Sequence, residues 1–220
     1  MFHPRQTKSF LRWSQYAFFI VGILALGYVG FALADARFYQ AYQTLRFQKT
    51  LNGLGPSVGS GDHLSPPLLP PSLAEANHAR AESLLMAESG GFPLGRIEIS
   101  SIGLAAMILE GTDEGTLRRA VGHVAGSSLP GQKGNIAIAG HRDTFFRGLR
   151  NIHTDDEITL TTLTGFYRYR VDSAKVVQPE DTDVLDESDD SILTLVTCYP
   201  FYFIGSAPQR FIVRAHRSPG

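Results

Sequence analysis

The chain contains a single cysteine, Cys198, in a setting that favours chemistry over packing. It ends the apolar, β-branched run 194–197, and Pro200 stops this predicted strand two residues later. A second predicted strand begins at Arg210. A thiol at the end of one strand and a guanidinium at the start of the next would place a nucleophile and a permanent cation at one edge of a sheet.

A catalytic cysteine also needs a partner that handles protons. His141 is the strongest candidate because it follows the buried-strand pattern 135–139, so its imidazole lies at a strand end as the thiol does. His123, which also follows a glycine, is the next candidate, and a structural role is the simpler interpretation there. A lone histidine at a strand end is commonly structural too, so His141 gains weight mainly from the company of Cys198.

Two arginines compete for the role of the cation. An arginine keeps its charge near neutral pH, and its fork of N–H donors suits an oxyanion or a bound carbonyl. Arg210 opens the last predicted strand, and Arg214 lies four residues further on the same face. Asp143 could orient an imidazole or pair with Arg142, although a surface position is the simpler interpretation. The sequence thus offers no firm carboxylate to orient His141.

An apolar segment near the N-terminus is long enough to cross a membrane. No charged residue occurs from Trp13 to Ala34, and about 20 residues at ~1.5 Å rise span a hydrocarbon core of ~30 Å. Arg5, Lys8 and Arg12 precede it with no acidic residue among them, so the positive-inside rule predicts a cytoplasmic N-terminus and an extracytoplasmic remainder. A cleaved signal peptide is the alternative, but the apolar run exceeds the usual length of a signal-peptide core.

Changes in composition divide the chain into successive parts. We predict a cytoplasmic N-terminus over 1–12, a transmembrane helix over 13–34, a stalk and Gly/Pro/Ser-rich linker over 35–71, a short helix over 72–89 and a catalytic domain over 93–217. Ser72 and Glu75 form the capping-box pattern that starts the short helix. The formal net charge of -1 lacks the basic excess of nucleic-acid-binding proteins, so no nucleic-acid partner is expected.

The catalytic domain is predicted to be mainly β. Many short strand-like runs with turn signals between them are typical of a closed or nearly closed barrel. These runs cover residues 95–99, 105–109, 135–139, 157–162, 166–172, 175–177, 192–197 and 210–215, and helical patterns cover only 112–120 and 145–149. One cysteine excludes an internal disulfide. The scattered histidines show no metal-ligand spacing, and the acidic run 181–190 is typical of a solvated loop, so no metal and no cofactor are expected.

Three motifs together resemble the sortase family, the membrane-anchored cysteine transpeptidases of the bacterial surface. They are Thr-Leu-Val-Thr-Cys198, Gly-His141 after an Asn-Ile-Ala-Ile-Ala strand, and Arg210 in a closing strand. The resemblance covers about residues 95–215 and is most similar in wording to class D sortases or the related single sortases of Gram-negative bacteria. It implies an eight-stranded sortase-type β-barrel with few short helices.

The resemblance also implies a role for each motif residue. Cys198 would attack the peptide carbonyl in an LPxTG-like C-terminal sorting signal and form a thioacyl intermediate. His141 would protonate the departing amine and later deprotonate the incoming one, while Arg210 would stabilise the oxyanion or hold the substrate in register. Thr197 matches the threonine that the family carries before its nucleophile. The implied partners are surface or pilin-like proteins with a sorting signal, and an amine acceptor on a cell-wall peptide or a lysine.

Two other functions are compatible with the same residues. Another exported Cys–His peptidase or an L,D-transpeptidase would use the same nucleophile with a different acceptor, and the wording around Cys198 disfavours it. A non-catalytic membrane-anchored binding domain would bury Cys198 as a small apolar residue. An unpaired exported thiol is a liability unless it is used, which disfavours this second alternative.

Overall fold

The computed structural model describes residues 4–53, 93–203 and 205–218. The chain forms two compact units, Met1–Tyr39 and Gln40–Gly220. The linker residues 54–71 and the short helix predicted over 72–89 lie outside the described residues. Both units are therefore considered separately, and the second one carries the residues singled out above.

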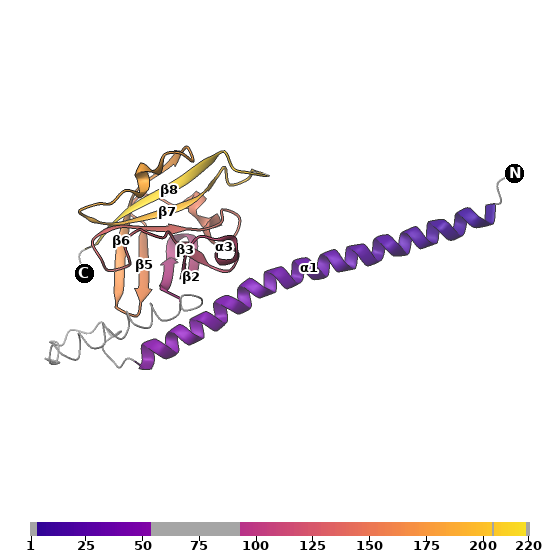
Figure 1. The fold of residues 1–220 in the computed structure, drawn as a ribbon, viewed down its shortest axis with the longest axis horizontal. Helices are drawn as coiled ribbons and strands as arrows, with labels where there is room; N and C mark the ends of the chain where they lie inside the picture. Colours follow the sequence, from indigo (N-terminus) through magenta and orange to yellow (C-terminus); the bar gives the residue numbers. More distant parts are fainter. Residues whose placement is uncertain (1–3, 54–92, 204, 219–220) are drawn as a thin grey trace. The chain divides into compact units, whose positions relative to one another are not determined.

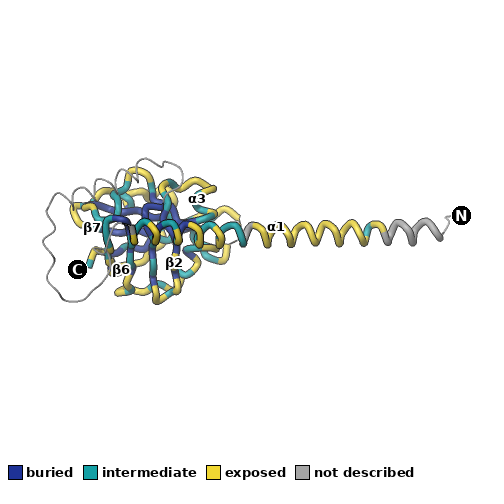
Figure 2. Tube along the Cα trace, turned by 90° about the horizontal axis from the view of Figure 1, so that it is seen from below, coloured by how far each residue is buried: buried dark blue, intermediate teal, exposed yellow. Residues whose placement is uncertain are grey.

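The first unit consists of helix α1 (Pro4–Gly53), which continues into the second unit. Its large apolar side chains from Trp13 to Phe31 are exposed, as the yellow run in Figure 2 shows. A window of this helix has a mean hydropathy of 2.3 and none of it is buried. Among the described residues, α1 is the one helix that is long and apolar enough to cross a membrane by length and composition.

The second unit is built around a closed eight-stranded barrel with the strand order β1-β2-β3-β4-β7-β8-β6-β5 (Figure 1). The strands are β1 (Gly95–Ile99), β2 (Leu104–Glu110), β3 (Val121–His123), β4 (Gly134–Ala139), β5 (Glu157–Thr162), β6 (Phe166–Val177), β7 (Ser191–Tyr199) and β8 (Gln209–Arg217). Between them lie helix α3 (Glu114–Arg119) and the 3-10 helices η1 (Ser100–Ile102), η2 (Phe145–Asn151) and η3 (Thr182–Leu185). The predicted mainly β fold is confirmed.

The strand patterns of the sequence locate most of the barrel. The runs 166–172 and 175–177 are one strand, β6, whose pairing with β8 shifts register between Val171 and Ser173. Such a bulge breaks the alternation of side chains, so a continuous strand looks like two in the sequence. The sequence analysis missed β3 because three residues are too few to display a period.

Because side chains alternate along each strand, one set fills the barrel and the other set lies on its outer face. In β7, Leu193 and Leu195 face the core, and Ile136 and Ile138 of β4 lie directly beside them. All four side chains are fully buried, and each contributes roughly 1.5–3 kcal/mol through the hydrophobic effect. Because successive side chains alternate, Cys198 lies on the outer face of the barrel.

The last turns of α1 belong to the second unit and pack against the barrel. Phe47 is buried in a small apolar cluster with Met107 of β2 and Leu163. Gln40 donates to the Arg119 carbonyl at 2.6 Å and accepts from the Met107 N–H at 2.9 Å. The residues around 40–51, predicted as part of a stalk, therefore also cover one side of the barrel.

Candidate active site

Cys198, His141 and Arg210 lie at neighbouring positions on three adjacent strands or strand ends. Cys198 in β7 is directly opposite Arg210 in β8. Strand β4 runs parallel to β7 with Ala139 beside Val196, so His141, two residues beyond Ala139, comes level with Cys198. Neighbouring strands in a sheet are ~4.8 Å apart. The strand order thus brings the three predicted residues to the same end of three neighbouring strands.

Gly140 fixes the backbone immediately before His141. Its N–H donates to the Val196 carbonyl at 3.1 Å, and its carbonyl accepts a hydrogen bond from the Thr197 hydroxyl at 2.7 Å. Thr197 is buried and faces inward, whereas the next residue, Cys198, is half-exposed on the other face. The threonine before the cysteine therefore ties the end of β4 to β7 just below the thiol.

Gly140 also leaves room for the ring of Phe146. A Cβ atom at Gly140 would stand 2.8 Å from this ring, and Phe146 is fully buried in the core. The Phe146 N–H donates to the His141 carbonyl at 3.0 Å, which holds the turn after β4 closed. The sequence analysis missed this packing, because a glycine before a histidine carries no sign of the ring that covers it.

Beside Cys198, the outer face of β4 and β7 is accessible. Ala139, Val196 and Cys198 are half-exposed, whereas Ala137 and Thr194, further from the thiol, are fully buried. The connection between β6 and β7, which contains η3, covers this more distant part, as its hydrogen bonds to β4 show. An accessible apolar strip therefore leads along the two strands to the thiol, and an extended peptide can lie on it.

The register distinguishes the two candidate arginines. The Nη1 atom of Arg210 donates to the carbonyls of Ala207 and Gln209 at 3.3 and 3.0 Å, and its other donors form no hydrogen bond within the described residues. These donors are left for a substrate oxygen. Arg214 lies opposite Thr194, about 13 Å further along the strand at ~3.3 Å per residue. The pairing with Cys198 therefore favours Arg210.

Within the described part of the chain, neither the thiol of Cys198 nor the imidazole of His141 forms a hydrogen bond. Asp143 is exposed and makes no ion pair there either. Arg142 instead donates to the carbonyls of Phe203 and Gly205 at 2.7 and 3.0 Å, which ties the β7–β8 connection to the segment after His141. A nucleophile and an acid–base group without internal partners are free to engage a substrate.

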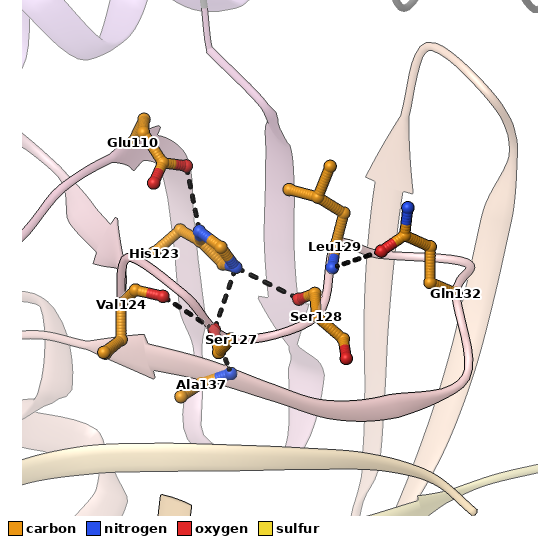
Figure 3. A network of polar contacts seen from close by, with 8 residues as sticks. All are labelled: Glu110, His123, Val124, Ser127, Ser128, Leu129, Gln132 and Ala137. Atoms are coloured by element: carbon orange, nitrogen blue, oxygen red, sulfur yellow. Dashed lines mark hydrogen bonds and ion pairs between the residues drawn. The ribbon is translucent and has the colours of Figure 1, made fainter. Parts of the chain in front are cut away.

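His123, the second histidine candidate, has a structural role (Figure 3). Its Nδ1 lies 2.8 Å from the Glu110 carboxylate, and its Nε2 lies 3.0 Å from the Ser128 carbonyl. Each ring nitrogen therefore has an oxygen partner within the fold. The Ser127 hydroxyl also lies 3.0 Å from Nε2, and it donates to the Val124 carbonyl at 2.8 Å. Because both ring nitrogens are engaged by groups of the fold, we assign His123 a structural role.

A cavity lies away from the thiol, at the start of β4. It measures about 280 Å³ and is lined by Ser128, Lys133, Gly134, Glu187, Ser188 and Asp189. Gly134 is six residues from Gly140, or about 20 Å along an extended strand. No group of three or more His, Cys, Asp or Glu side chains is placed to hold a metal ion in the described ranges. We therefore assign the site from the register of Cys198 and not from the cavity.

Comparisons with known proteins identify the barrel. A family model described as a sortase domain matches residues 97–218. Sortase D of Bacillus subtilis (strain 168) is 32% identical over 197 residues, which cover 89% of this chain and 93% of that protein. Among solved structures, a Clostridium perfringens Sortase D5 transpeptidase has a TM-score of 0.64 and 26% identity, covering 84% of this chain and 99% of its own. Sortase C-1 from Actinomyces oris has a TM-score of 0.56 and 28% identity, covering 82% and 98%.

Proposed function

The chain belongs to the sortase family, and from this membership we propose that it cleaves an LPxTG-like C-terminal sorting signal and joins the cleaved protein to an amine at the cell surface. Sortases are cysteine transpeptidases, so the chain is an enzyme of this class. The observation that carries the proposal is the register of Cys198 with Arg210 and its alignment with His141 on one face of the barrel.

The first half of the proposed reaction is acylation of the enzyme. The Cys198 thiolate attacks the carbonyl carbon of the peptide bond to be cleaved, and the C=O electrons move onto oxygen. The free N–H donors of Arg210 stabilise this oxyanion. Protonated His141 gives its proton to the departing amine as the C–N bond breaks. The products are a thioester on Cys198, the released C-terminal peptide and a neutral imidazole.

The second half is transfer of the acyl group. Neutral His141 removes a proton from the incoming amine, whose nitrogen attacks the thioester carbon. Collapse of the second tetrahedral intermediate breaks the C–S bond and restores the thiolate and the imidazolium. A protonated His141 and a cationic Arg210 both stabilise the thiolate electrostatically. The same charged groups therefore act in both halves of the reaction. The amine belongs to a cell-wall peptide or to a lysine of another protein subunit.

The apolar part of α1 fits a retained membrane anchor. We propose that the N-terminus is cytoplasmic and the barrel extracytoplasmic, because basic residues precede the apolar run and Asp35 follows it. Protease treatment of intact cells or spheroplasts, followed by detection of tags at the two ends, tests this orientation. Digestion of the N-terminal tag with protection of the C-terminal tag would reverse the assignment.

The activity is tested with a synthetic peptide that carries an LPxTG-like pentapeptide, a fluorophore and a quencher, with triglycine as the amine. We expect cleavage, a ligated product, and an acyl adduct on the peptide that contains Cys198, detected by mass spectrometry. The Cys198→Ala variant is the control and should give neither product. Cleavage without ligation to any amine would favour a peptidase, and a Cys198 that stays unmodified in a folded, active enzyme would refute the mechanism.

A further inference from the structure

We infer that Asn135 and Thr194 are positioning residues, which fasten the β6–β7 connection to the face of the barrel that carries Cys198. The inference rests on the proposed function, because it concerns how the peptide is held beside the thiol. Neither residue carries a group suited to the chemistry. Both are polar residues in otherwise apolar strands, and both are buried, with exposures of 2% and 0%.

The two side chains form one hydrogen-bonded unit with the connection. The amide nitrogen of Asn135 donates to the carbonyls of Val184 and Asp186, both at 3.1 Å. Its amide oxygen accepts a hydrogen bond from the Thr194 hydroxyl at 2.7 Å. Turning the amide over would set an oxygen against two carbonyl oxygens, so the network fixes its orientation. The two N–H donors of the buried Asn135 amide find these carbonyls only while the connection is docked, whereas the bond to Thr194 lies within the barrel and holds the amide in position.

Among the described residues, the connection has few side chains that anchor it to the barrel. In η3, Val184 is buried at 5% exposure, and the residues on either side are exposed or half-exposed. Most of the remaining hydrogen bonds are local, such as those between Gln178 and Asp181. Within the part of the chain that the structure describes, Val184 and the Asn135 amide are therefore the principal anchors of the connection.

The docked connection borders the strip that leads to the thiol. Thr194 lies on the same face of β7 as Cys198 and four residues before it, about 13 Å at ~3.3 Å per residue. Asn135 lies on the same face of β4 as Ala139, two residues before His141. At this separation the pair cannot touch the reacting atoms, but it can set the wall beside an extended peptide. We therefore expect it to act mainly on peptide binding, and thus on KM.

The test uses the full chain in detergent with the Asn135→Asp variant. This change keeps the shape and still accepts from Thr194, but it places a carboxylate oxygen against the carbonyls of Val184 and Asp186. We expect faster hydrogen exchange of the amides in residues 178–190. We also expect kcat/KM for the signal peptide to fall about 10- to 100-fold, mostly through KM. The rate at which methyl methanethiosulfonate modifies Cys198 should not change, because this small reagent needs no peptide site.

Three further variants serve as controls. Asn151→Asp adds the same charge at an exposed position with no hydrogen bond among the described residues, and should behave as wild type. Thr194→Val removes only the hydroxyl and should change exchange and KM in the same direction by a smaller factor. Thr194→Ser keeps a hydroxyl at this position, so its hydrogen exchange and its KM should both stay close to those of the wild type. These two variants keep the test decisive if Asn135→Asp fails to fold.

The outcomes separate this inference from the proposed function. Normal exchange over 178–190 and a normal KM in Asn135→Asp would overturn the positioning role while leaving the transpeptidase proposal intact. A fall in kcat with unchanged KM would also overturn it, since a displaced wall should weaken binding. A wild-type enzyme that cleaves no sorting peptide would refute the proposed function, and with it any role of this pair in the reaction.

Discussion

The chain contains two Gly-His pairs, and the structure gives their imidazoles different surroundings. Gly122-His123 lies within β3, and its imidazole is buried between a carboxylate and two further oxygens. Gly140-His141 follows the end of β4, and its imidazole is half-exposed with no hydrogen bond inside the described residues. The two strands are hydrogen-bonded neighbours, so neither the local sequence nor the region of the barrel separates the two histidines.

The number of acceptors around each ring decides the role. Both nitrogens of His123 lie within hydrogen-bond distance of oxygens fixed by the fold, so the ring has no site left for a substrate. The ring of His141 has no such partner within the described residues, and the segment that carries it follows β4, which pairs with the strand of Cys198. A histidine whose hydrogen bonds are satisfied internally contributes to stability, whereas one left unsatisfied at an accessible edge can exchange protons with a ligand. This difference predicts which substitutions change activity and which change stability.

The largest effects should follow substitution of the unsatisfied pair. Cys198→Ala should reduce peptide cleavage to background, because no other thiol exists in the chain. His141→Ala should reduce kcat about 10²- to 10⁴-fold, the usual worth of general acid–base catalysis. Neither should lower the melting temperature by more than about 1 or 2 °C, because a loss of 1 kcal/mol lowers it by only ~2–4 °C in a domain of roughly 150–250 residues. Peptide kinetics and thermal unfolding, measured side by side, check both. If the His141→Ala protein proved unfolded, His141 would have a structural role, as His123 does.

A smaller loss should distinguish the arginines of β8. Arg210→Ala should lower kcat about 10²- to 10³-fold, as removal of an oxyanion donor does in other acyl transfers. Arg214→Ala should change kcat by less than about threefold, because its Cα partner in β7 is Thr194 and not Cys198. Steady-state kinetics of the two variants make the comparison. The reverse ranking would show that the register does not decide which guanidinium meets the oxyanion.

Strand patterns were sufficient to predict a mainly β, barrel-like fold. Apolar runs predicted β4, β7 and β8, and the ends of these strands brought Cys198, His141 and Arg210 forward as candidates. The pairing of Cys198 with Arg210 could not be predicted, because it depends on β7 and β8 being neighbours in register. The family resemblance supplied this arrangement only as an expectation, and sequence spacing alone left Arg214 as an equal rival.

The partners of polar side chains were much harder to predict. Nothing near His123 in the sequence indicates Glu110, which lies 13 residues before it and reaches it only through the parallel pairing of β2 and β3. The bond between Asn135 and Thr194 joins residues 59 apart, and its only trace in the sequence is a polar residue inside each apolar run. Long-range polar contacts leave no period to recognise, so three-dimensional structure is needed to find them.

Substitution of Gly140, the residue before His141, should lower kcat less than substitution of Cys198 does and more than substitution of His123 does. In Gly140→Ala the new Cβ would meet the Phe146 ring at 2.8 Å, so the turn that carries His141 must shift. A displacement of about 1 Å in a catalytic group costs on the order of 10²-fold in rate. We expect kcat to fall by about this factor and stability to fall modestly. The double variant Gly140→Ala/Phe146→Leu relieves the contact and should recover part of the activity. No recovery would mean that crowding by Phe146 is not the cause.

The smallest effect on activity should come from His123, where stability changes instead. His123→Ala removes a buried side chain and leaves the partly buried Ser128 carbonyl without this partner, which should lower the free energy of unfolding by about 1–3 kcal/mol. Glu110→Gln should cost less than about 1 kcal/mol, because the Glu110 side chain is 55% exposed and its ion pair is partly screened by water. Urea unfolding measures both, and kcat per folded molecule should stay at the wild-type value. A His123→Ala enzyme of normal stability but low kcat would mean that the buried network reaches the chemistry after all, since β3 and β4 share a register and a shift in one displaces the other.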